Sequence, residues 1–210
     1  MLLILIFITI AVSYIGAYSL EKSFLKYSFF IDSPTERSSH KNSTPTAGGL
    51  SILLAYFFYV YLLLAFHESL IPWYDGHQEY TQNPFFILIA VLSPIMIIGL
   101  IDDFKEANPG IRLLVQFFSA SLIIYYFQVS NDIFELEKQT SQSALMIIII
   151  SIILSMWLMN LYNFMDGIDG YASSECIFVS FSAAVLAYIN NPDSIVSLCI
   201  GGLGVANIGF

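Results

Sequence analysis

The stretch ALMIIIISIILSMWL, residues 144–158, is almost entirely apolar and contains no charged side chain. Extended through residue 161, it approaches the length of about 20 apolar residues that a helix needs to cross a bilayer. It leads directly into MNLYNFMDGIDGYAS, residues 159–173, which holds two asparagines, two aspartates and two glycines between residues 160 and 170. The chain therefore places a cluster of oxygen donors at the end of a membrane helix.

The composition of the whole chain is that of an integral membrane protein. Of its 210 residues, 57% are hydrophobic and 11% are charged, and the mean hydropathy is +0.76. A soluble domain carries about 25% charged residues. The formal net charge of −9 argues against a nucleic-acid partner, because phosphate binding needs a basic surface. Cys176 and Cys199 lie in apolar segments without a metal-binding spacing, so neither a zinc site nor a disulfide framework is predicted.

Seven apolar stretches come near the length of a membrane span, and no barrel-like alternation appears. We therefore predict an all-α, polytopic transmembrane helical bundle of about seven helices, forming a single domain over residues 1–210. The predicted helices are residues 2–20, 48–66, 85–101, 111–129, 144–161, 176–189 and 194–210. The last stretch ends at Phe210 while still apolar, so we expect the chain to be a fragment of a longer protein.

The basic residues predict the orientation in the membrane. The loops at residues 67–84, 130–143 and 190–193 hold only Lys138. The loops at residues 21–47, 102–110 and 162–175, with the helix start that follows the second of them, hold the others: Lys22, Lys26, Arg37, Lys41, Lys105 and Arg112. Cytoplasmic loops are enriched in Lys and Arg. These loops are therefore predicted to be cytoplasmic and the N-terminus to lie outside, with an uncleaved first helix, since no basic segment precedes it.

Two groups of oxygen donors fall in the predicted cytoplasmic layer. Their members are Asp102, Asp103, Asn160, Asn163, Asp166 and Asp169. Asn160 and Asn163 are three residues apart and share a helix face, while Gly167 and Gly170 favour a tight turn after the helix. Clustered carboxylates repel one another unless cations or protons neutralise them, and such donors suit Mg²⁺ or Mn²⁺. The alternative is that these side chains are solvated helix ends.

The first predicted cytoplasmic loop supplies the opposite charge in DSPTERSSHKNSTPTAGGL, residues 32–50. Arg37, His40 and Lys41 precede the pair Gly48 and Gly49, which stands at the start of the second predicted helix. Cationic side chains and exposed N–H groups at a helix start form a phosphate site. The alternative is that Arg37 and Lys41 serve topology alone.

Three motifs in this order resemble the polyprenyl-phosphate N-acetylhexosamine-1-phosphate transferases, glycosyltransferase family 4. The resemblance is closest to the bacterial branch that initiates O-antigen and related surface glycans. The motifs are D-x-P-x-x-R-S-S-H with T-P-x-x-G-G at residues 32–49, G-x-x-D-D at residues 99–103, and N-L-Y-N-F-M-D-G-I-D-G at residues 160–170. Family members continue beyond the counterpart of Phe210 into a loop with an M-G-D aspartate, so the resemblance covers the front part of such an enzyme.

The resemblance implies transfer of a sugar-1-phosphate from a UDP-N-acetylhexosamine to undecaprenyl phosphate, with release of UMP. It implies a multi-pass enzyme of the bacterial inner membrane whose active site faces the cytoplasm and uses Mg²⁺ or Mn²⁺. The residues that match the family's site are Asp102 and Asp103 as catalytic groups, Asp166, Asp169 and Asn163 as metal ligands, and Arg37, His40, Lys41, Asn160, Gly48 and Gly49 as substrate-binding groups. The donor sugar, the glycan pathway, a one-step or covalent mechanism and the oligomeric state, with a homodimer as one option, stay open.

Two other functions are alternatives to the transferase. An ion- or proton-coupled transporter carries its ionisable groups near the bilayer midplane, whereas the acidic residues here lie at predicted helix ends. An inactive, truncated remnant of the transferase is the second alternative.

Overall fold

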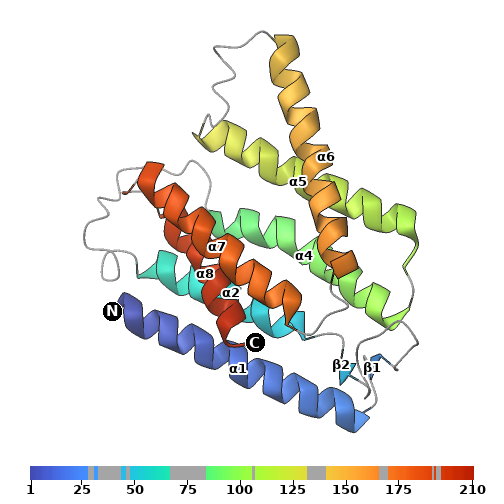
Figure 1. The fold of residues 1–210 in the computed structure, drawn as a ribbon, viewed down its shortest axis with the longest axis vertical. Coiled ribbons are helices and arrows are strands. Elements are labelled where there is room, and N and C mark those ends of the chain that lie inside the picture. Colours follow the sequence, from blue (N-terminus) through green and yellow to red (C-terminus); the bar gives the residue numbers. More distant parts are fainter. Residues whose placement is uncertain are drawn as a thin grey trace. The chain divides into compact units, whose positions relative to one another are not determined.

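The computed structural model describes residues 1–27, 31–32, 44–45, 48–66, 84–105, 107–131, 141–165, 170–190, 192 and 195–210. These ranges form seven helices and one short two-stranded ladder (Figure 1). The elements are α1 (Leu2–Tyr27), β1 (Ile31–Asp32), β2 (Thr44–Pro45), α2 (Gly49–Ala65), α4 (Pro84–Phe104), α5 (Pro109–Asn131), α6 (Ser141–Met165), α7 (Tyr171–Asn190) and α8 (Val196–Ile208). The predicted all-α bundle of about seven helices is confirmed.

The chain divides into two compact units, which are described separately. The first comprises Met1–Glu79 with Asp166–Phe210, and the second comprises Tyr80–Met165. The single domain predicted over residues 1–210 stays a prediction.

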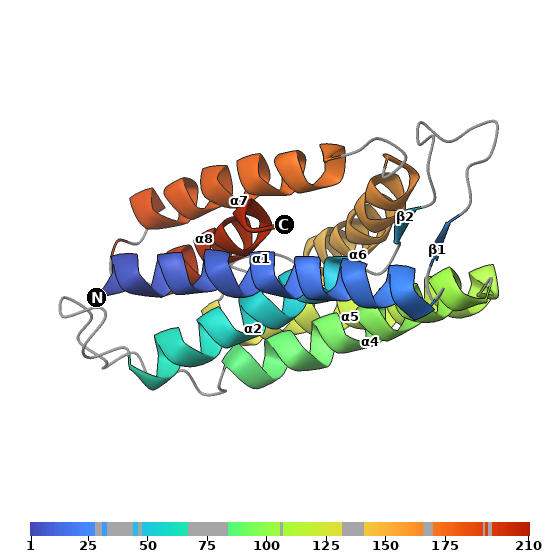
Figure 2. The same cartoon turned by 90° about the horizontal axis from the view of Figure 1, so that it is seen from below.

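In the first unit, α8 packs against α1, α2 and α7, and it lies among them in both views (Figures 1 and 2). Its buried residues are mostly small, including Gly202, Gly204 and Ala206. Small residues let helix backbones approach closely, which is how helices associate in a membrane without a hydrophobic driving force between them. Val60 and Leu63 of α2 are fully buried in the same unit.

In the second unit, α5 packs against both α4 and α6. The buried face of α5 includes Gln116, Ser119 and Ala120, which are spaced three and four residues apart and therefore lie on one side of the helix. Helix α6 is highly apolar, yet none of the residues in its most hydrophobic part is buried inside the structure.

Within the described part of the chain, five helices are long and apolar enough to span a membrane: Leu2–Tyr27, Phe85–Phe104, Pro109–Tyr126, Gln142–Asn163 and Tyr171–Asn190. Helices α2 and α8 are also apolar but shorter. The outward surfaces are apolar as well, with Phe7 70% and Phe178 73% exposed. Exposed apolar helices of this length are stable in lipid, so this is a multi-pass membrane protein. Its orientation in the membrane stays a prediction.

Five helices, α1, α4, α5, α6 and α7, extend beyond the segments predicted from hydropathy, and two of them do so by five residues or more at one end. Helix α1 continues to Tyr27, seven residues past the predicted end at residue 20, and α7 begins at Tyr171 instead of residue 176. Glu175 thus lies within a helix. Hydropathy marks only the part of a helix that sits in hydrocarbon, whereas backbone hydrogen bonding continues into the polar interface, where Glu and Lys are good helix formers.

Candidate functional site

The G-x-x-D-D motif ends helix α4. Asp102 and Asp103 occupy the last turn of α4, which continues to Phe104 and so includes both residues that were predicted to begin the loop at residues 102–110. Asp103 is exposed and Asp102 is half-buried. The two carboxylates thus have different surroundings although they are adjacent in the sequence.

The carboxylate of Asp102 is bonded within the protein through both of its oxygens. Its Oδ1 accepts a hydrogen bond from the backbone N–H of Ala107 at 2.8 Å. Its Oδ2 accepts one from a guanidinium N–H of Arg112 at 2.9 Å, which is also an ion pair. The side chains of Arg112 and Asp102 are 32% and 30% exposed, so solvent screens this pair only in part.

Helix α5 begins in a way that places Arg112 in its first turn. Pro109 is the first helical residue, a position where its missing N–H costs no hydrogen bond. The side-chain oxygen of the preceding Asn108 accepts a bond from the N–H of Gly110 at 2.8 Å, and its carbonyl accepts bonds from Ile111 and Arg112. Asn108 therefore caps the helix, as asparagine commonly does.

Asn160 and Asn163 lie on the last turns of α6, which continues to Met165, past the predicted helix end at residue 161. The amide of Asn160 donates to Oε1 of Gln116 at 2.8 Å, and Gln116 returns a bond of 3.4 Å to Oδ1 of Asn160. Asn160 also donates to the carbonyl of Met156 at 2.8 Å. Asn163, in contrast, is exposed. Helix α5 thus links the second and third motifs, because Asp102 of α4 and Asn160 of α6 both bond to side chains of α5.

The turn that follows α6 is described only at its end. Gly170 has a φ of +70°, the left-handed region that favours glycine, and its carbonyl accepts a hydrogen bond from the N–H of Ser174 at 3.0 Å. The predicted glycine turn before α7 is thereby confirmed at Gly170. Asp166 and Asp169 lie outside the described residues, so their predicted role as metal ligands stays a prediction.

The first motif is described only at its two ends. Strands β1 and β2 pair antiparallel, with Ile31 opposite Pro45 and Asp32 opposite Thr44. Arg37, His40 and Lys41 lie between them in the sequence, outside the described residues, and their predicted binding of phosphate stays a prediction. Gly49 begins α2, and a Cβ added there would meet nothing within 4 Å.

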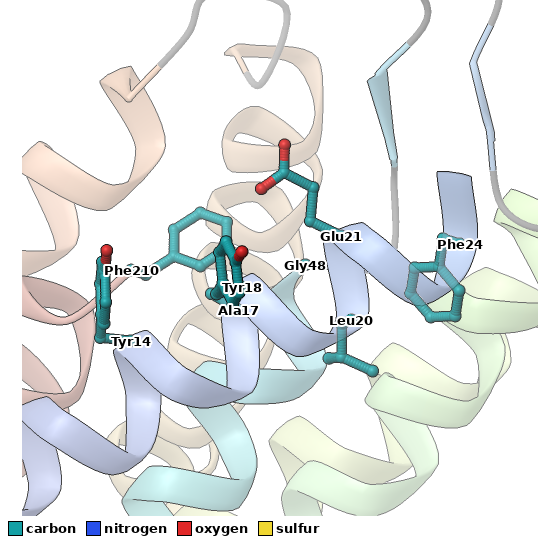
Figure 3. A pocket seen from close by; sticks show the side chains of 8 residues that line it. All are labelled: Tyr14, Ala17, Tyr18, Leu20, Glu21, Phe24, Gly48 and Phe210. Carbon is teal, nitrogen blue, oxygen red and sulfur yellow. The ribbon is translucent and has the colours of Figure 1, made fainter. Parts of the chain in front are cut away.

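Gly48 borders a pocket of about 320 Å³ in the first unit (Figure 3). The ring of Phe210 lies close to Gly48, and a Cβ added at Gly48 would be 2.7 Å from the Cε2 atom of that ring. Six residues of α1 complete the lining: Tyr14, Ala17, Tyr18, Leu20, Glu21 and Phe24. Glu21 is the only charged side chain among the described residues that line the pocket, and it would repel a phosphate. The pocket therefore adds no support to the phosphate site predicted at Gly48.

The donors described at the motif helices are compatible with a hard cation. Asp103 and Asn163 are exposed and offer carboxylate and amide oxygens, which are ligands that suit Mg²⁺ and Mn²⁺. Within the described ranges no three His, Cys, Asp or Glu residues gather closely enough to form a metal site by themselves.

Arg112 and Gln116 were not predicted as site residues. Arg112 was predicted only as a basic residue at a cytoplasmic helix start, and no role was predicted for Gln116. Their signal in the sequence is a basic and an amide side chain four residues apart, at the start of the apolar helix that follows the paired aspartates.

Comparison with known proteins identifies the family. The model of glycosyl transferase family 4 matches residues 85–210, which contain the second and third motifs. The phospho-N-acetylmuramoyl-pentapeptide-transferase of Staphylococcus epidermidis is 27% identical over 175 residues, covering 76% of this chain and 51% of the relative. The undecaprenyl-phosphate alpha-N-acetylglucosaminyl 1-phosphate transferase of Thermotoga maritima is 27% identical over 157 residues, covering 75% of this chain and 43% of the relative.

The chain thus spans about half the length of the curated relatives it matches. No solved structure matches it. The family model covers more than half of the chain, including Asp102, Asp103, Asn160 and Asn163. The chain belongs to glycosyl transferase family 4.

Proposed function

We propose that the protein transfers an N-acetylhexosamine-1-phosphate from a UDP-sugar to undecaprenyl phosphate and releases UMP. The observation that carries the proposal is the family match over residues 85–210 together with the paired aspartates and the N-L-Y-N-F-M-D-G-I-D-G motif inside it. The name of the Thermotoga relative, which specifies undecaprenyl phosphate and N-acetylglucosaminyl 1-phosphate, supports this choice of acceptor and donor. The resemblance favours a first step of O-antigen or related surface-glycan synthesis at the bacterial inner membrane.

The reaction exchanges one phosphoanhydride bond for another. An oxygen of the lipid phosphate attacks the phosphorus that carries the sugar, and a new diphosphate joins lipid and sugar. The bond from that phosphorus to the oxygen shared with the uridine-side phosphate breaks, and UMP leaves with the electron pair. A phosphate monoester has a second pKa of about 6, so the acceptor is largely ionised at neutral pH. The protein must mainly position the two anionic substrates and offset their charge.

The placement of the motif residues supports distinct roles for the two aspartates. Asp103 is exposed at the end of α4, where a lipid phosphate at the membrane surface could be oriented by its carboxylate. Asp102 is held by Arg112 and the backbone of Ala107. Arg37, His40 and Lys41, with the helix start at Gly48 and Gly49, would bind phosphate by charge and N–H groups.

A divalent cation suits carboxylate and amide oxygens such as those of the second and third motifs. Asn163, with Asp166 and Asp169, would hold Mg²⁺ or Mn²⁺, which when bound neutralises negative charge on the diphosphate. Asp103 is an exposed carboxylate of the same predicted layer.

The transporter alternative is less well supported. The described ion pair of the second unit lies at helix ends, because Asp102 is in the last turn of α4 and Arg112 in the first turn of α5. Transport pathways place such groups near the bilayer midplane.

The test is synthesis of a labelled lipid by the full-length protein in membranes. We expect undecaprenyl diphosphate-sugar and UMP to form in equal amounts from UDP-GlcNAc or UDP-GalNAc. Asp103→Asn should lower the rate at least 100-fold at equal protein level. The proposal would be overturned if the protein made no labelled lipid from these donors or from UDP-N-acetylmuramoyl-pentapeptide. An unchanged rate in Asp103→Asn would remove the role given to this carboxylate.

A further inference from the structure

Helix α5 makes side-chain hydrogen bonds to both helices that carry the acidic motifs. Arg112 in its first turn bonds to Asp102 of α4 at 2.9 Å. Gln116, four residues later, bonds to Asn160 of α6 at 2.8 Å. Residues four apart on a helix lie on neighbouring parts of one face. One face of α5 thus connects the end of α4 to the end of α6.

The bond to α4 is one of two that hold the carboxylate of Asp102. Its two carboxylate oxygens accept one bond each, from Arg112 and from the N–H of Ala107. Charge-assisted bonds of this kind are stronger than neutral ones and fix the geometry of both groups. The carboxylate therefore ties the last turn of α4 to the first turn of α5 across the short connection between them.

The bond to α6 lies deeper in the unit. Gln116 is only 6% exposed, so its amide has little access to water. A buried amide without a partner is costly, and Asn160 satisfies it through two reciprocal hydrogen bonds of 2.8 and 3.4 Å. The second donor capacity of Asn160 goes to the carbonyl of Met156, in its own helix. Asn160 thus faces α5, whereas Asn163 is exposed.

We propose that Arg112 and Gln116 are positioning residues of the transferase, and this rests on the proposed function. They hold Asp102 and Asn160 inside the protein and thereby fix the adjacent, exposed Asp103 and Asn163 where substrates and cation meet. Neither Arg112 nor Gln116 touches a substrate. Asn160 then acts through Gln116 instead of binding the substrate directly.

An exchange of the two amides tests the link between α5 and α6. In the full-length protein, Gln116→Asn shortens one side chain of the pair, and Asn160→Gln lengthens the other. Each single variant should lower kcat at least tenfold, with KM for the UDP-sugar within threefold of wild type. The double variant Gln116→Asn/Asn160→Gln restores the summed length and should recover kcat to within threefold of wild type. A double variant as slow as Asn160→Gln alone would show that Asn160 contacts a substrate and would overturn the proposal.

Arg112 is tested by a matched pair of substitutions. Arg112→Lys retains the charge and should keep at least one third of the wild-type kcat, whereas Arg112→Met should lose at least tenfold. An increase in KM with unchanged kcat in Arg112→Met would indicate direct binding of the donor and would overturn the positioning role, as would wild-type kinetics in this variant. All rates are normalised to the monodisperse protein, so that a smaller folded fraction does not count as lower kcat.

A readout without activity separates this proposal from the proposed function. The amide exchange should also restore the midpoint of thermal unfolding lost in the two single variants. If the protein makes no lipid product but the exchange restores the midpoint, the proposed function fails while the pair itself stands. If the decreases in the unfolding midpoint of the two single variants simply add in the double variant, the two side chains do not pair in the protein and the proposal fails.

Discussion

Replacing Gly202 by alanine should destabilise the first unit, because the added methyl group has no space. Gly202 is buried in α8, and a Cβ built there would overlap the ring of Tyr59 on α2. Tyr59 is 2% exposed, and its hydroxyl donates a hydrogen bond to the carbonyl of Leu198 at 3.3 Å. The ring therefore cannot turn aside without losing that bond.

The expected free-energy change combines three effects. Overpacking of a dense interior costs about 1–3 kcal/mol, and loss of the Tyr59 hydrogen bond adds about 0.5–1.5 kcal/mol. The better helix propensity of alanine offsets about 0.5–1 kcal/mol. The net destabilisation is about 2 kcal/mol, which for a chain of this size corresponds to a decrease in Tm of about 4–8 °C.

The neighbouring glycine provides a matched control. A Cβ at Gly201 would lie 3.5 Å from the Cβ of Ala184, an ordinary van der Waals contact. Gly201→Ala should therefore leave the Tm unchanged or slightly raise it through helix propensity. The assay is thermal unfolding of both full-length variants in one detergent, followed by loss of the monodisperse peak on size exclusion. Equal Tm values for the two alanine variants would refute the close contact between Gly202 and Tyr59.

Two further predictions concern the proposed site and the orientation. Removal of divalent cations by EDTA should abolish formation of the labelled lipid, and added Mg²⁺ or Mn²⁺ should restore it, because the substrates and the acidic motifs need cations between them; synthesis that continues in EDTA would rule out this requirement. In a variant with Cys176 and Cys199 replaced by alanine, Ser39→Cys should resist an impermeant reagent applied from outside while Gln78→Cys reacts, because the basic loops are predicted to be cytoplasmic. The opposite labelling would invert the topology.

The family resemblance and most of the helices could be predicted from local features of the sequence. The run at residues 144–158 predicts a membrane helix, and α6 contains it. Gly170 predicts a turn, and its φ of +70° confirms it. The end of α1 and the start of α7 differ from the predicted bounds because both helices continue into polar residues that hydropathy excludes. The roles of Asp166, Asp169, Arg37, His40 and Lys41 stay predictions.

The sequence by itself determined the class of protein and the order of its motifs. Its apolar runs are long enough to require helices in lipid, where every backbone polar group must be bonded within the segment. This requirement is local, so it can be evaluated one segment at a time.

Only the tertiary structure decided which polar side chains bond to one another. The structure pairs Arg112 with Asp102 and Asn160 with Gln116. The partners depend on how each helix is rotated about its axis. That rotation results from packing between segments distant in the sequence, here 44 residues apart for Gln116 and Asn160, and no local pattern specifies it.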